Sequence, residues 1–221
     1  MGVSLLGDRP STLVVSNNLN IALIKKELNI AIALLFRLGL LVGGRQERLS
    51  TLVVSIPRTG QNLINETCET SARDDPNISY NFCTTSLQAA PASQCAALRG
   101  LGMISIRLVR YNVTDTRCYI KHLMKNRKWD PYSKQCLKDC FELFSDAISS
   151  VKQATKYYNS KRYDDANVQI SSVMDAVTTC EDGFKERKGL VSPLTERNRN
   201  TFQLSAVALS VLHMIQKGSD V

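Results

Sequence analysis

The sequence predicts an all-α protein: an up-down-up-down four-helix bundle with an N-terminal helical hairpin, held by disulfide bonds. Three observations predict this fold. Apolar residues repeat with helical spacing over four long segments after residue 60, no segment shows strand-like alternation, and four of the seven cysteines lie symmetrically about expected turns. A chain of 221 residues, 43% hydrophobic and 22% charged, is long enough for one globular domain and an additional segment.

Residues 1–59 stand apart from the helical pattern. Residues 25–42 have the basic start and apolar run of a signal peptide, but Arg37 interrupts the run and Glu27 lies in its basic part. The six residues STLVVS occur at 11–16 and again at 50–55, which is too little for a repeat fold. We therefore expect 1–59 to be a non-domain extension or a degenerate signal or anchor region, and the helical domain to span 60–218.

The helical domain is expected to begin with a short hairpin over residues 61–88, outside the bundle. Four helices with apolar stripes follow it. The first, over 98–124, has a stripe at Leu101, Ile104, Leu108, Tyr111, Ile120 and Leu123. The second, over 133–158, has one at Leu137, Phe141, Phe144, Ile148, Val151, Thr155 and Tyr158. The third, over 163–184, has one at Ala166, Ile170, Val173, Val177, Cys180 and Phe184. The fourth has one at Leu204, Ala208, Val211 and Ile215.

Capping residues and glycines predict where these helices begin and end. Asp130-Pro131 and Ser192-Pro193 each place a capping side chain before a proline that suits a first helical turn. Three glycines are expected to end helices: Gly183, Gly189 and Gly218. The short connections between the long helices predict antiparallel neighbours, hence the up-down-up-down order.

Two disulfides are predicted from symmetry about the turns. In an antiparallel helical hairpin, residues at one level are equidistant from the turn, because both arms rise about 1.5 Å per residue. Cys140 and Cys180 have their midpoint at Ser160, and Cys68 and Cys83 have theirs within the turn 73–77. We expect these two pairs to be bridged.

The other cysteines leave alternatives open. Cys118 and Cys140 are centred on Trp129, also near a turn, so Cys118 is a rival partner for Cys140. The pairing of Cys95, Cys118 and Cys136 stays undecided, and an odd total of seven leaves at least one thiol free or paired between molecules.

Composition and motifs favour a secreted binding protein and exclude several other classes. The net charge of +8 is spread along the chain, and the one dense basic run, Lys121 to Lys128, is typical of a solvated helix end, so no nucleic-acid partner is expected. No catalytic motif, cofactor motif or metal-binding pattern is present, and only His122 and His213 could supply an imidazole. Three glycosylation sequons, at Asn65, Asn77 and Asn112, agree with a secretory route.

Several strings resemble the plant invertase and pectin methylesterase inhibitors. They are Asn81-Phe82-Cys83 with Ser86-Leu87, Gly100-Leu101-Gly102, Tyr163 to Asn167 (YDDAN), Thr179 to Phe184 (TCEDGF) and Gly189 to Thr195 (GLVSPLT). Together with the cysteine layout they cover about 150 residues, essentially all of the chain after residue 60. The strings TCEDGF and VSPLT look most like the invertase-inhibitor branch that includes a plane-tree pollen allergen.

The resemblance implies an inhibitor that binds another protein and is not an enzyme. Invertase inhibitors of this family insert the turn between the second and third bundle helices, with a Pro-Lys-Phe segment, into the cleft of a cell-wall or vacuolar invertase. The matching residues here are Lys161, Arg162 and Tyr163, which keep the cation and the aromatic ring but not the proline. Without that proline, the turn is expected to be less preorganised.

Two other functions stay open. Pectin methylesterase inhibitors of the family bind through the bundle helix faces, here those of 133–158 and 163–184. A member of another class would be a non-inhibitory secreted carrier or structural protein, although the filled apolar stripes favour binding through the surface. We expect a secreted monomer of the apoplast or vacuole, without stable membrane association after processing and without cofactor or metal.

Overall fold

The computed structural model describes residues 60–126 and 128–219, and all its described elements are helices. A hairpin comes first, made of α2 (Gly60–Asp74) and α3 (Tyr80–Gln88), followed by the short 3-10 helix η2 (Pro91–Cys95). The four long helices are α4 (Leu98–Met124), α5 (Pro131–Asn159), α6 (Tyr163–Lys185) and α7 (Thr195–Ser219). The expectations for residues 1–59 lie outside the described residues.

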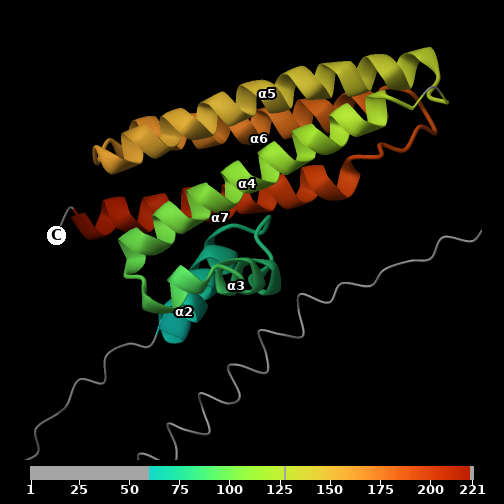
Figure 1. Ribbon diagram of the computed structural model, residues 1–221. Coiled ribbons are helices and arrows are strands. Elements are labelled where there is room, and N and C mark those ends of the chain that lie inside the picture. The colour runs from blue at the N-terminus through green and yellow to red at the C-terminus, as the bar shows by residue number, and fades with distance from the viewer. Residues whose placement is uncertain (1–59, 127, 220–221) are drawn as a thin grey trace, which may run out of the picture. The chain divides into compact units, whose positions relative to one another are not determined.

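The four long helices form an up-down-up-down bundle (Figure 1). Going around the bundle, α4 packs on α5 and α7, and α6 packs on the same two helices. The predicted fold class is therefore confirmed. One end of the bundle gathers the start of α4, the turn between α5 and α6 and the end of α7, while the other end holds the α4–α5 and α6–α7 connections.

The α2–α3 hairpin packs against α7 and α4, outside the ring of four helices (Figure 1). Its fully buried Ile64 and Leu87 join the same apolar core as the bundle. Ser210 of α7 donates a hydrogen bond to Ser71 of α2 at 2.8 Å, and the backbone N–H of Ser79 donates to the Gln203 side chain at 3.1 Å. The hairpin is thus part of one cooperative core and not an appendage.

The apolar stripes identify most of the core, with two corrections. All predicted stripe residues of the third and fourth helices are buried. On α4, however, Tyr111 is 76% exposed, and the core side is continued by Val109 and Val113. On α5 the buried face is centred on Cys140, Ala147 and Ala154, and the predicted Phe141, Ile148 and Thr155 are only half-buried. The prediction followed the large apolar side chains Phe141 and Ile148, which lie at the edge of the buried face. Cys140, Ala147 and Ala154 are small, which lets α6 pack closely against α5.

The predicted helix boundaries are partly correct. Asp130 caps α5 by accepting from the backbone N–H groups of Tyr132 and Ser133, as expected. The pKa of its carboxyl is lowered, first by the hydrogen bond from the Ser133 hydroxyl. In contrast, α7 begins at Thr195, and Ser192 caps only the preceding turn through the N–H of Leu194.

Of the three glycines expected to end helices, only Gly189 lies in a connection, at φ 82°. Gly183 lies inside α6, which continues to Lys185, and Gly218 lies inside α7. Helix α6 continues past Gly183, whose carbonyl accepts a hydrogen bond from the Tyr132 hydroxyl of α5 at 2.8 Å.

The structure contains the disulfides Cys68–Cys83 and Cys140–Cys180, the two pairs that we expected. The rival pairing of Cys118 with Cys140 is therefore wrong, and Cys118 is an exposed free thiol, as is Cys95. Cys136 is free and buried, and burial raises the pKa of its thiol.

The described part of the chain contains neither a membrane span nor a metal cluster. None of the helices over 60–126 and 128–219 is long and apolar enough to cross a bilayer. Within the same residues, no group of three or more His, Cys, Asp or Glu side chains could hold a metal ion. The basic run that begins at Lys121 ends α4, where the Trp129 indole N–H donates to the Leu123 carbonyl at 3.0 Å.

Candidate functional site

The turn between α5 and α6 contains the three residues that the resemblance implies as inhibitory. Residues 160–162 join Asn159 to Tyr163 at the end of the bundle (Figure 1). Lys161 and Arg162 are exposed, whereas Tyr163 is half-buried. The turn therefore presents two cations to the outside and anchors itself through the aromatic residue.

Backbone hydrogen bonds fix the shape of this turn. The N–H of Arg162 donates to the Tyr157 carbonyl at 2.9 Å, and the N–H of Lys161 donates to the Tyr158 carbonyl at 3.0 Å. These two bonds form a Schellman motif, in which one residue adopts the left-handed conformation. That residue is Lys161, at φ 59°, a conformation that costs about 1–2 kcal/mol for a residue with a Cβ atom.

The absence of the family's proline led us to expect a less preorganised turn. Proline is restricted to φ near −65° and could not occupy position 161 in this conformation. The turn is organised instead by the Schellman hydrogen bonds and by the side chains around it.

Arg162 is held by two contacts. Its Nε donates to Oδ2 of Asp165 at 2.6 Å, and its guanidinium lies 4.6 Å from the ring centroid of Tyr157. The hydrogen bond to Asp165 raises the pKa of Arg162, so the side chain stays charged. Because the bond to Asp165 uses only Nε, the two terminal nitrogens remain available to a carboxylate of another molecule.

Tyr163 and Tyr158 connect the turn to α4. Their rings pack edge-to-face with centroids 5.4 Å apart. The Tyr158 hydroxyl donates to the Arg99 carbonyl at 2.5 Å, and burial raises the pKa of Tyr158 to about 12. Gly102 makes room for this ring, since a Cβ atom there would lie 2.5 Å from the Tyr158 hydroxyl oxygen.

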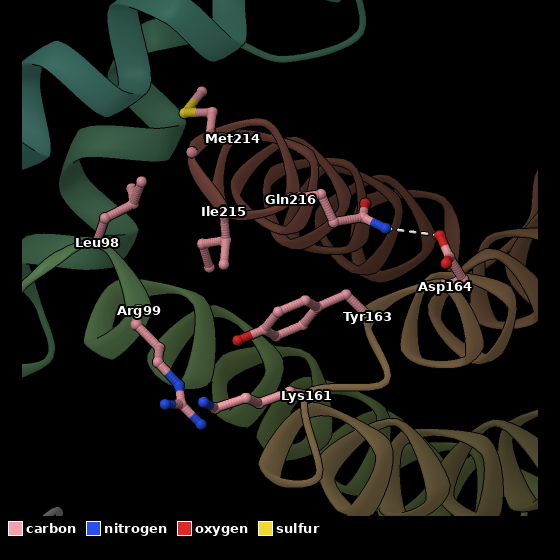
Figure 2. A pocket seen from close by; sticks show the side chains of 9 residues that line it. Leu98, Arg99, Lys161, Tyr163, Asp164, Met214, Ile215 and Gln216 are labelled. Atoms are coloured by element: carbon pink, nitrogen blue, oxygen red, sulfur yellow. Dashed lines mark hydrogen bonds between the residues drawn. The ribbon is translucent and has the colours of Figure 1, made fainter. Parts of the chain in front are cut away.

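A cleft of about 830 Å³ opens beside the turn (Figure 2). Lys161 and Tyr163 line it from the turn, Arg99 from the start of α4, and Ile215 and Gln216 from the end of α7. Sequence reasoning missed Arg99 and Gln216, because they lie far from residue 161 in the chain. The Arg162–Asp165 pair could have been predicted from the sequence, because the two residues have (i, i+3) spacing at the start of a helix.

Two of the strings that carry the family resemblance, TCEDGF and GLVSPLT, lie at the other end of the bundle. Glu181 accepts hydrogen bonds from Thr195 at 2.7 Å and from Asn198 at 2.8 Å, which ties the end of α6 to the start of α7. The Asn198 amide also contacts the sulfur of Cys180. These residues build the junction beside the Cys140–Cys180 bridge, so they support the fold.

The three sequons differ in their surroundings. Asn77 lies exposed in the α2–α3 turn, whereas Asn65 is half-buried on α2. The Asn112 side chain is half-buried on α4, and its carbonyl oxygen accepts from the Thr201 hydroxyl of α7 at 2.5 Å. Asn77 therefore offers the most open position for a glycan.

Comparison with known proteins identifies the relatives of this chain. The family model described as "Plant invertase/pectin methylesterase inhibitor" matches residues 62–211. A Platanus acerifolia protein named "Putative invertase inhibitor" is 42% identical over 154 residues, which cover 70% of this chain and 86% of that protein. An Actinidia deliciosa protein named "Pectinesterase inhibitor" is 28% identical, over 70% of this chain and 80% of that one.

A solved structure shares the fold. It is the crystal structure of a mutant form of a pectin methylesterase inhibitor from Arabidopsis, with a TM-score of 0.57 and 20% identity. The match covers 68% of this chain and 95% of that chain. At this level of identity, the likeness supports the helical architecture alone.

Proposed function

Because this chain belongs to the plant invertase/pectin methylesterase inhibitor family, we propose that it inhibits a plant cell-wall or vacuolar invertase by inserting the α5–α6 turn into the active-site cleft. Its relatives are named as inhibitors of enzymes, and the chain itself is not an enzyme. The Platanus acerifolia relative, at 42% identity, supports invertase as the target.

The single observation that carries the proposal is the exposed cationic turn. Glycoside hydrolases hold a pair of carboxylic side chains on either side of the bond that they cleave. The Lys161 ammonium and the terminal nitrogens of Arg162 project from a fixed backbone and can approach such a pair. Since Asp165 and Tyr157 already hold the Arg162 side chain, little conformational entropy is lost on binding.

The direct test is titration of a cell-wall invertase with the 221-residue chain and its Arg162→Ala variant at mildly acidic pH. We expect the inhibition constant to rise about 10- to 100-fold, because charge-assisted hydrogen bonds are lost. Arg187→Ala is a matched control. That arginine pairs with Asp130 and lies over the Tyr132 ring in the same manner, at the opposite end of the bundle.

Unchanged invertase inhibition by Arg162→Ala would contradict the role of the turn. Inhibition of a pectin methylesterase, equally strong in both arginine variants, would instead support binding through the faces of α5 and α6. The exposed Val168 on α6 is an apolar contact point on that surface. Substituting it by Lys would then weaken inhibition of the esterase and leave the turn intact.

We also propose a secreted monomer of the apoplast or vacuole. Two disulfides agree with an oxidising compartment, and an Arabidopsis thaliana relative, 29% identical, is named "Cell wall / vacuolar inhibitor of fructosidase 2". Filled core positions such as Phe144, Ile170 and Phe184, each without exposure, favour binding through the surface over a carrier role.

A further inference from the structure

Two cations line the cleft beside the turn. Arg99 comes from α4 and Lys161 from the turn, and Figure 2 shows their charged ends directed toward each other. No ion pair joins either side chain to another residue within 60–126 and 128–219. Two like charges brought together in this way favour the binding of an anion between them.

The position of this pair is determined by the fold. The Tyr158 hydroxyl donates to the Arg99 carbonyl, which holds the start of α4 against the end of α5. The Schellman turn fixes the backbone of Lys161 on the other side. The two cations are therefore presented by fixed backbones that lie 62 residues apart in sequence.

The remaining groups of the cleft indicate a ligand that carries hydrogen-bond donors and an apolar face as well as negative charge. Asp164 accepts a hydrogen bond from the Gln216 amide at 2.6 Å, so an acceptor and an amide lie together across the cleft from the cations. An ionised carboxylate can only accept hydrogen bonds, so a ligand beside Asp164 has to bring donors. The half-buried Tyr163 ring adds a flat apolar face to the same cleft.

A carboxylated sugar has all the complementary groups. Its carboxylate suits Arg99 and Lys161, its hydroxyls can donate to Asp164, and its ring can lie against Tyr163. An acidic peptide or an inorganic anion brings negative charge to Asp164 and no such set of hydroxyl donors. A volume of about 830 Å³ is within the range of small-ligand sites and admits a short oligomer.

We propose that the cleft between the start of α4, the α5–α6 turn and the end of α7 binds short uronic acid oligomers, with the carboxylate held by Arg99 and Lys161 and the hydroxyls by Asp164 and Gln216. This site shares Lys161 with the turn that we propose to be inhibitory, but saccharide binding can be measured without any target enzyme.

The test is calorimetric titration of the full chain with trigalacturonate, its methyl ester and triglutamate. We expect saturable binding of trigalacturonate and at least about tenfold weaker binding of the other two, because the ester lacks charge and the peptide lacks hydroxyls. Arg99→Gln and Lys161→Gln should each weaken trigalacturonate binding about tenfold. Arg107→Gln, an exposed arginine two turns further along α4, should leave it unchanged.

An Asp164→Ala variant distinguishes a saccharide ligand from a peptide ligand. It should weaken trigalacturonate and strengthen triglutamate, since a hydroxyl acceptor and a repelling charge disappear together. Equal affinity of the wild-type chain for triglutamate and trigalacturonate would overturn the proposal in favour of an acidic protein partner. Absence of trigalacturonate binding, or unchanged binding in Arg99→Gln, would overturn it as well. Far-ultraviolet circular dichroism verifies that each variant is folded.

Discussion

Two helical hairpins of this protein are each closed by one disulfide, but the bridge lies at very different distances from the turn. In the α2–α3 hairpin, Cys68 and Cys83 are 15 residues apart and flank the turn closely. In the α5–α6 hairpin, Cys140 and Cys180 are 40 residues apart, so the bridge lies about 30 Å along the helices from Ser160. The first bridge fixes its own turn, whereas the second fixes the far end of its hairpin.

The difference shows where the geometry of the candidate site originates. Neither disulfide of the described residues lies near the α5–α6 turn, so its shape depends on the Schellman hydrogen bonds, the Tyr158–Tyr163 contact and the Arg162–Asp165 pair. The Cys140–Cys180 bridge instead supports the α6–α7 junction, where the strings TCEDGF and GLVSPLT lie. Fold stability and turn geometry are therefore expected to respond to different substitutions.

The largest effect is expected from removing the bridge of the longer hairpin. Cys140→Ala with Cys180→Ala should lower the free energy of unfolding by about 4 kcal/mol, and Cys68→Ala with Cys83→Ala by about 3 kcal/mol, because the longer loop restricts the unfolded chain more. Guanidinium unfolding followed by circular dichroism measures both values. A greater loss for the shorter loop would show that native packing, and not loop length, decides their contributions.

A smaller effect is expected at the glycine that receives the Tyr158 ring. Gly102→Ala places a Cβ atom 2.5 Å from the Tyr158 hydroxyl oxygen and 2.9 Å from Ile215, and should cost about 1–3 kcal/mol. Gly183→Ala is the control, since apart from the adjacent backbone of its own helix its Cβ would meet no described atom within 4 Å; it should gain about 0.5 kcal/mol. Thermal unfolding distinguishes the two, and equal stability of both variants would show that the close approach at Gly102 is easily relieved.

Loss of the Tyr158 hydroxyl should have a lesser effect. Tyr158→Phe removes the hydrogen bond to the Arg99 carbonyl and should cost about 1 kcal/mol. The pKa of Tyr158 is raised to about 12, so its stabilising contribution is complete below the unfolded value of about 10 and is lost as pH rises from there through about 12. Unfolding measured across this range should show a steeper loss of stability for the wild type than for Tyr158→Phe. Parallel curves of unfolding free energy against pH for the two proteins would contradict the raised pKa of Tyr158.

The smallest effect on stability is expected at the exposed Arg162–Asp165 pair. Arg162→Ala should change the free energy of unfolding by less than about 1 kcal/mol, because exposed ion pairs contribute little. The same substitution is expected to change inhibition strongly, so stability and function separate at this residue. A stability loss as large as that of Gly102→Ala would indicate that Arg162 holds the turn together and is not reserved for a target.

Much of the candidate site could be located from sequence, but its geometry could not. The turn around Ser160 was predicted between two helical stripes, and the family resemblance pointed to Lys161 and Arg162 within it. The sequence predicted a less preorganised turn because Lys161 stands where the family has a proline, and it did not predict the left-handed backbone at Lys161. It also placed Tyr111 in the core, because a periodic pattern cannot distinguish adjacent positions at the edge of a stripe.

The sequence by itself predicted the four long helices after residue 60, their antiparallel order, the two assigned disulfide pairs and the family resemblance, because helical periodicity, symmetric spacing and local strings are all properties of short or regular stretches of chain. Tertiary structure alone decided which face of α5 meets α6, and which residues surround the turn. Arg99, Lys161 and Gln216 converge because α4, the turn and α7 end at one level of the bundle. Such contacts depend on the rotation and register of packed helices, which side-chain volumes fix only when all four helices are assembled.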